Sequence, residues 1–142
     1  MTQAPISRGG DRFMPDWVLG LAIRLSIVPG LWIWGRANAA EWPGVSPDIV
    51  IAADYWGIPL IPAPLLAQIA VWGAHIVALM LAVGFLTRLV GFVLLAFSLA
   101  YLLWIVPDSW VSVSVFAAVS FYLFARGSGA LSVDGALAAT TR

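Results

Sequence analysis

The stretch that decides the fold is residues 65–106, LLAQIAVWGAHIVALMLAVGFLTRLVGFVLLAFSLAYLLWIV. It holds two continuous apolar runs, 65–86 and 89–106, which only Thr87 and Arg88 separate. Each run is close to the roughly 20 apolar residues that a helix needs to cross a bilayer. Continuous apolar character, without alternation, favours helices over the strands of a membrane barrel. The stretch therefore predicts an antiparallel pair of transmembrane helices joined by a very short turn.

Two more apolar runs flank this pair, at about 17–35 and 110–125. The first contains Arg24, whose charge costs about 2.5–3.5 kcal/mol at the centre of a span, and the surrounding apolar residues can offset that cost. The predicted fold is all-α. We expect an integral membrane four-helix bundle that makes residues 1–142 a single transmembrane domain.

The composition agrees with a chain embedded in lipid. Hydrophobic residues make up 62% of the 142 residues and charged residues 10%, whereas a soluble domain carries roughly 25% charged residues. The mean hydropathy is +0.97. The net charge of zero gives no reason to expect nucleic acid as a partner.

The residue types also limit the cofactors that this chain can hold alone. It has no Cys and a single His, at position 75. Covalent c-type haem, iron–sulfur ligation and a haem between two histidines of this chain are therefore excluded. The sequence shows no flavin motif, and it predicts no metal site.

Two short helices are predicted outside the spans. Ser46-Pro47-Asp48 is typical of a helix start and predicts a helix over 47–56, on the membrane surface or capping the bundle. Its apolar side would consist of Ile49, Ala52, Ala53 and Trp56. The surrounding outer loop is either a structured linker or a binding lid. Ser132 predicts a second short helix at about 133–139.

Two details of the spans follow from residue type. Gly84 and Gly91 predict a close approach between the second and third spans, because small residues let helix backbones come together in membranes. Asp108 or Ser109 is the expected cap at the start of the fourth span.

The arginines predict the orientation of the chain. The four-span arrangement places Arg36 alone on one side of the membrane. On the other side it places Arg8, Arg12, Arg88, Arg126 and Arg142. The positive-inside rule then places both termini in the cytoplasm, for a multi-pass protein of the inner (plasma) membrane. A cleaved signal peptide ending at Ala37-Asn38-Ala39 is the rival interpretation. The length of the apolar stretch and its interruption by Arg24 argue against it.

Polar side chains inside the spans are candidates for a ligand site. Arg24 lies in the inner half of the first span, and Gln68, Trp72 and His75 share one face of the second. A neutral histidine can bond to a carbonyl group and relay a proton, so these four residues form the candidate ligand site. The alternatives are an arginine that snorkels to the headgroups and a histidine that joins two helices by a hydrogen bond.

A second group of charged residues is predicted at the cytoplasmic face. Arg88, Arg126 and Asp134 should meet there. They would either anchor the tail to the turn between the second and third spans or form a docking surface for a soluble partner.

Three short stretches resemble the DoxX/DoxD family of small bacterial and archaeal four-span membrane proteins. They are the first span with Arg24 and Gly30-Leu-Trp-Ile-Trp-Gly35, the stretch Leu81-Ala-Val-Gly-Phe-Leu-Thr-Arg88, and the tail Gly127-Ser-Gly-Ala-Leu-Ser-Val-Asp134. Together they cover roughly residues 17–137. The family often has an acidic residue early in the second span, which this chain replaces with His75 or its neighbours, so a role for that carboxylate does not carry over.

The family takes its name from the DoxD subunit of an archaeal thiosulfate:quinone oxidoreductase. The resemblance implies a membrane subunit of a quinone-linked redox complex, with a quinone as the candidate ligand and electrons supplied by a partner. Any enzymatic activity would belong to that complex and not to this chain alone. The alternative is a non-catalytic anchor, assembly or accessory subunit, and either function implies partner subunits or a homo-oligomer within the lipid bilayer. A small-molecule carrier is a weaker third reading, because one four-helix bundle leaves little room for alternating access.

Overall fold

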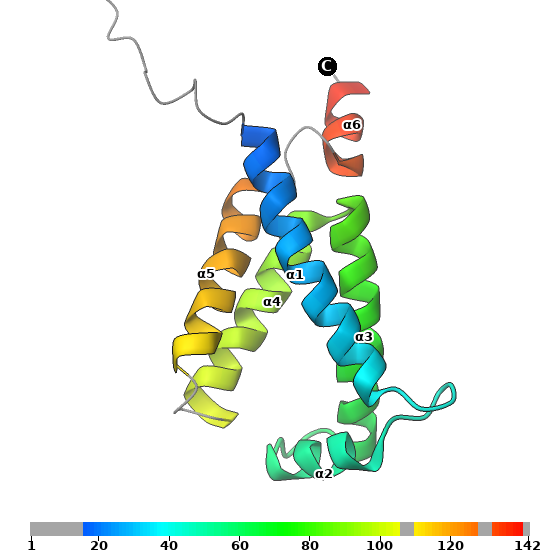
Figure 1. Ribbon diagram of the computed structural model, residues 1–142. Helices are drawn as coiled ribbons and strands as arrows, with labels where there is room; N and C mark the ends of the chain where they lie inside the picture. Colours follow the sequence, from blue (N-terminus) through cyan, green and yellow to red (C-terminus); the bar gives the residue numbers. More distant parts are fainter. Residues whose placement is uncertain (1–15, 106–109, 128–131, 141–142) are drawn as a thin grey trace, which may run out of the picture.

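The computed structural model describes residues 16–105, 110–127 and 132–140 (Figure 1). These residues are helical apart from turns and one isolated bridge between Ala39 and Val45. The elements are α1 (Asp16–Asn38), α2 (Pro47–Tyr55), α3 (Ala63–Val83), α4 (Thr87–Ala100), the π-helical segment η1 (Tyr101–Ile105), α5 (Trp110–Arg126) and α6 (Val133–Thr140). The predicted all-α class is therefore confirmed for the described residues.

Three of the helices are long and apolar enough to cross a membrane. They are Trp17–Asn38, Ala63–Val83 and Thr87–Ile105, and the shorter helix Trp110–Arg126 is apolar as well. Large apolar side chains cover the outside of these helices; Leu103 is 73% exposed and Val111 is 84% exposed. Because water would penalise so much exposed apolar surface, lipid is the solvent of this protein, and it is an integral membrane protein.

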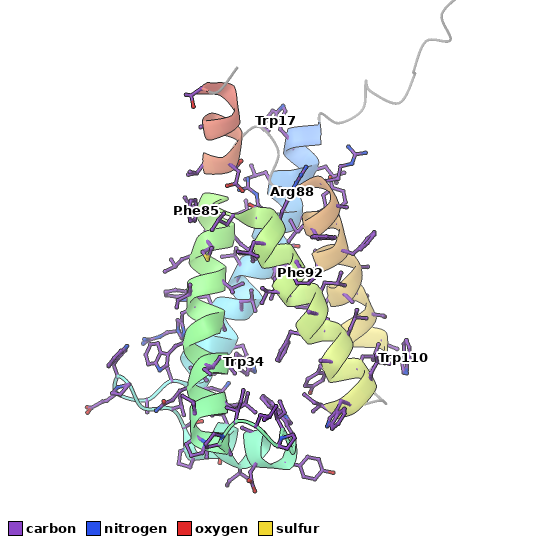
Figure 2. All side chains as sticks on the ribbon, turned by 180° about the vertical axis from the view of Figure 1, so that it is seen from behind. Trp17, Trp34, Phe85, Arg88, Phe92 and Trp110 are labelled. Atoms are coloured by element: carbon purple, nitrogen blue, oxygen red, sulfur yellow. The ribbon has the colours of Figure 1, made fainter. Side chains whose placement is uncertain are left out.

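The long helices form two pairs, α1 with α3 and α4 with α5. The pairs meet at the end that carries the turn between α3 and α4, which we call the turn end, and they diverge toward the end that carries α2, the α2 end (Figure 1). Seen from behind, Trp17 and Arg88 lie at the turn end, and Trp34 and Trp110 lie toward the α2 end (Figure 2). The main core comprises Ile27, Leu81, Val90, Leu94 and Leu123.

The turn between α3 and α4 does not lie where the apolar runs place it. Helix α3 ends at Val83, and residues 84–86 form the turn, so Thr87 and Arg88 belong to α4 and do not link the spans. Gly84 adopts the left-handed conformation (φ 74°) that glycine tolerates without strain, and Leu86 adopts it too (φ 48°). The left-handed Gly84 stops α3 although the following residues are apolar.

The prediction that Gly84 and Gly91 bring the second and third spans together is wrong. A Cβ atom at Gly91 would lie 2.5 Å from the backbone nitrogen of Phe124, so this glycine allows α4 to approach α5. A Cβ atom at Gly84 would collide with the guanidinium of Arg24, so this glycine makes room for a side chain of α1.

The two short helices lie at opposite ends of the molecule (Figure 1). Helix α2 begins after Ser46, as predicted, although the Ser46 side chain makes no capping hydrogen bond. Its residues Ile49 and Ala53 are buried against α3. Helix α6 follows Ser132, also as predicted. The expected cap at residues 108–109 lies outside the described residues.

Candidate functional site

Arg24 is the most deeply buried charged side chain described in this chain. It is 1% exposed, and its Nη1 atom lies against Gly84 in the turn. The Cβ atom of Ser132 lies at the same place, and the charge of Asp134 acts on the guanidinium. Arg24 therefore points toward the turn and the tail, where a carboxylate offsets the cost of burying its charge.

Asp134 fixes the tail to the turn. Its Oδ1 accepts a hydrogen bond from the backbone N–H of Leu86, and its Oδ2 accepts one from the N–H of Thr87, both at 2.9 Å. Its own N–H donates to the carbonyl of Gly84 at 3.2 Å. The carboxylate thus caps the first turn of α4, where a negative charge also interacts favourably with the helix dipole.

The other two residues of the predicted cytoplasmic cluster behave differently. The Arg88 side chain is exposed and lies over Gly127, with its Nε atom 3.2 Å from the position of a glycine Cβ. Arg126 is the last residue of α5 and is also exposed. Asp134 anchors the tail to the turn through two backbone N–H groups, and its charge acts on Arg24.

His75 is enclosed by two tryptophans. Its ring stacks on Trp72 at 5.3 Å between centroids and meets Trp32 edge-on at 5.0 Å. Its Nδ1 lies 2.8 Å from the carbonyl of Val71, which assigns the proton to that nitrogen. A Cβ atom at Gly35 would lie 2.7 Å from the ring, so the α1 backbone also contacts the imidazole.

Of the four residues of the predicted ligand site, the structure brings Trp72 and His75 together and places Arg24 elsewhere. Trp72 and His75 are in contact, while Gln68 is half-buried on the same helix. The Arg24 guanidinium lies against Gly84. Gly84 follows His75 by nine residues, which corresponds to about 13 Å along a helix, so Arg24 is far from the histidine. Trp32 and Gly35 complete the histidine pocket, and sequence reasoning missed both because nothing local links them to His75.

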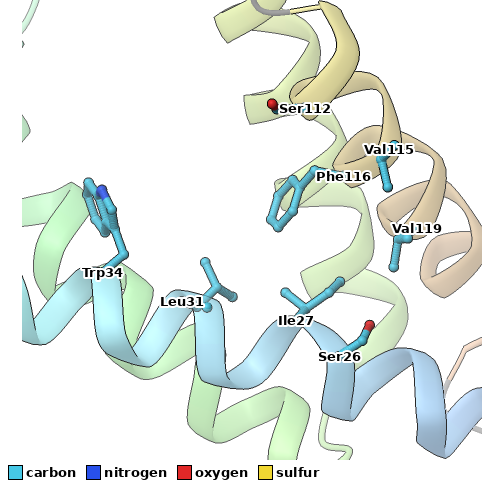
Figure 3. A pocket seen from close by; sticks show the side chains of 9 residues that line it. Ser26, Ile27, Leu31, Trp34, Ser112, Val115, Phe116 and Val119 are labelled. Carbon is cyan, nitrogen blue, oxygen red and sulfur yellow. The ribbon is translucent and has the colours of Figure 1, made fainter.

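Among the described residues, two cavities lie elsewhere, between α1 and the α4–α5 pair. The first, of about 420 Å³, is lined by Ser26, Ile27, Gly30, Leu31, Trp34, Ser112, Val115, Phe116 and Val119 (Figure 3). The second, of about 360 Å³, is lined by Trp34, Phe97, Ser98, Tyr101, Ser112, Val113 and Phe116. None of the four predicted ligand residues lines either cavity. The pattern of serines and aromatics indicated only helix packing, so the sequence did not reveal this groove.

The comparisons with known proteins place the chain in a family. No curated protein and no solved structure matches it. The family described as "TQO small subunit DoxD" matches residues 58–141, a stretch that begins just before α3 and ends just after α6. This stretch is more than half of the chain, and it includes the turn and the tail that carry the resemblance noted in the sequence. The chain therefore belongs to the DoxD family.

Proposed function

We propose that this protein is the membrane subunit of a quinone-linked redox complex. The observation that carries the proposal is the match to a family described as a small subunit, over residues 58–141. A subunit implies partner proteins, and a partner would deliver the electrons. The groove between α1 and the α4–α5 pair supports the proposal, because an apolar cavity open toward lipid suits a quinone dissolved in the membrane.

The proposal includes the four-span topology. Helix α5 has 17 residues, or about 25 Å, which nearly crosses a hydrocarbon core of about 30 Å. With α1, α3 and α4–η1 it gives four spans, and both termini then lie on the turn side. The arginines favour the cytoplasm for that side of an inner membrane.

The predicted ligand residues around His75 stay a prediction and define a rival site. Because Nδ1 of His75 donates to Val71, its Nε2 is left as an acceptor for a second partner. Arg24, in contrast, interacts with the tail, so we propose that it holds the fold together and does not contact a ligand.

The test is purification of the tagged chain from its native membrane in mild detergent, followed by mass spectrometry of bound proteins and lipids. We expect stoichiometric partner subunits, bound quinone, and quinone reduction by the complex when its electron donor is added. A purified chain that carries neither partner nor quinone would contradict the proposal.

A non-catalytic anchor is the second candidate function. The surface around α2 favours it, because Tyr55 is 86% exposed and Leu60 is 91% exposed at the α2 end, where a partner could cover them. A stable protein complex that lacks quinone, and whose electron transfer persists without this chain, would support the anchor instead.

A further inference from the structure

The two cavities are parts of one groove. Both are lined by Trp34 on α1 and by Ser112 and Phe116 on α5, so they share a wall. The groove runs along α1 from Ser26 to Trp34, about 12 Å of helix. Each cavity alone, at about 420 and 360 Å³, lies in the range of small-molecule sites.

The groove is mostly apolar, and a few residues with hydrogen-bonding side chains are among those that line it. Three residues that line the cavity nearest the α2 end carry a hydrogen-bond donor: Tyr101 and Ser112 have a hydroxyl, and Trp34 has an indole N–H. Among the described residues, none of these three groups is hydrogen-bonded. The hydroxyls of Ser26 and Ser98 instead donate to carbonyls of their own helices, at 2.7 and 2.6 Å.

The remainder of the wall is hydrocarbon. Ile27 and Leu31 on α1 face Val115 and Val119 on α5 across the gap (Figure 3). A chain-like apolar ligand would therefore have contacts on both sides, and burial of its methylenes would contribute most of its binding free energy.

The absence of charged residues in the groove indicates which kind of ligand headgroup it can hold. No residue that lines the two cavities carries a formal charge. An anionic phosphate would be left without a counter-charge there, whereas neutral carbonyl oxygens would accept from the three donors. Tyr101 also begins the π-helical segment η1, and such wide turns occur often at functional sites.

We propose that this groove is the quinone site, with the carbonyl headgroup at Tyr101, Ser112 and Trp34 and the isoprenoid chain along α1 and α5. The inference rests on the proposed function and adds to it the location and polarity of the site. On the four-span topology the headgroup lies in the outer half of the membrane. The site is distinct from the His75 pocket.

A cavity-filling variant tests the location of the chain. A Cβ atom at Gly30 meets nothing within 4 Å, so Gly30→Leu extends into the groove without striking the backbone. A Cβ atom at Gly73, on α3 and outside the groove, also meets nothing within 4 Å, so Gly73→Leu is the matched control. We expect Gly30→Leu to lose co-purified quinone and to weaken the binding of added decylubiquinone at least tenfold, and Gly73→Leu to retain both. Size-exclusion profiles establish that both variants fold.

Conservative variants test the headgroup contacts. Removing one donor, in Tyr101→Phe or Ser112→Ala, should weaken decylubiquinone binding about 2- to 10-fold. The matched controls are Tyr122→Phe and Ser114→Ala on α5, since neither side chain lines the groove, and both should bind like the wild type.

The outcomes separate this site from the proposed function. If the wild type carries quinone and Gly30→Leu, Tyr101→Phe and Ser112→Ala all bind it normally, the groove assignment is overturned while the function stands. Loss of quinone in His75→Asn alone would assign it to the rival pocket. Displacement of a phospholipid, and not of quinone, by Gly30→Leu would overturn the ligand class. A wild-type complex without quinone would refute the proposed function itself.

Discussion

Replacing Asp134 with asparagine should loosen the start of α4. The carboxylate accepts hydrogen bonds from the backbone N–H groups of Leu86 and Thr87, at 2.9 Å each. An asparagine amide has one acceptor oxygen, and its NH2 group would face the second N–H, so one of the two hydrogen bonds is lost. A hydrogen bond to a charged group contributes about 1.5–3 kcal/mol, and the lost charge also weakens the attraction to Arg24. We expect a local destabilisation of about 2–4 kcal/mol, since these effects are not fully additive.

Amide hydrogen exchange in detergent micelles measures this effect directly. The amides of Leu86 and Thr87 should exchange about 30- to 700-fold faster in Asp134→Asn, because each 1.4 kcal/mol is a factor of ten. Asp54→Asn is the matched control, since Asp54 is exposed on α2. Equal exchange in the two variants at both amides would refute the cap.

The electrostatic part can be isolated by a double-mutant cycle. If Arg24 and Asp134 interact, the variant Arg24→Gln with Asp134→Asn should be less destabilised than the sum of the single changes, by about 0.5–3 kcal/mol. Strict additivity of the free energies of unfolding would show that the tail and Arg24 act independently.

Three further predictions concern packing and topology. Gly91→Ala should cost about 1–3 kcal/mol and lower the melting temperature in detergent, because its Cβ would lie 2.5 Å from the α5 backbone. Gly35→Ala should also lower the melting temperature, because its Cβ would clash with the His75 ring. The double variant Gly35→Ala with His75→Ala should recover part of that decrease. Because the chain has no Cys, a Glu41→Cys variant should react with an impermeant maleimide on intact cells, and Ala136→Cys should react only after permeabilisation.

The two packing predictions share one control. Gly73→Ala adds a Cβ that meets nothing within 4 Å in a helix that favours alanine over glycine, so its melting temperature should be no lower than that of the wild type. An equal decrease in melting temperature in Gly73→Ala and Gly91→Ala would show that a steric clash at Gly91 is not the cause of the destabilisation. Labelling of Ala136→Cys on intact cells would contradict the proposed orientation.

The helices were predictable because their signals are local. Long apolar runs identify α1, α3, α4 and α5, and Ser46-Pro47-Asp48 identifies α2. The turn was not predictable, because residues 84–86 are nearly as apolar as the helices they separate. Its position depends on the left-handed Gly84 and on Asp134, whose partner Leu86 is 48 residues away in the sequence.

The candidate groove was hidden for a related reason. Its donors come from three different segments, Trp34 from α1, Tyr101 from η1 and Ser112 from α5. Each is an ordinary residue for a membrane helix, and hydroxyl groups in such helices commonly serve packing. Only the divergence of the two helix pairs makes them neighbours of one cavity, and that divergence has no signature in hydropathy.

The capping of the α3–α4 turn by Asp134 has a consequence for biosynthesis. Translation produces Arg24 first and its carboxylate only after the apolar helices α1, α3, α4 and α5 have been synthesised. Until then the membrane holds an arginine whose compensating charge does not yet exist, and such a charge is costly in lipid. A chain that ends before residue 134 would keep that cost uncompensated, and we expect it to be less stable in the membrane than the full chain.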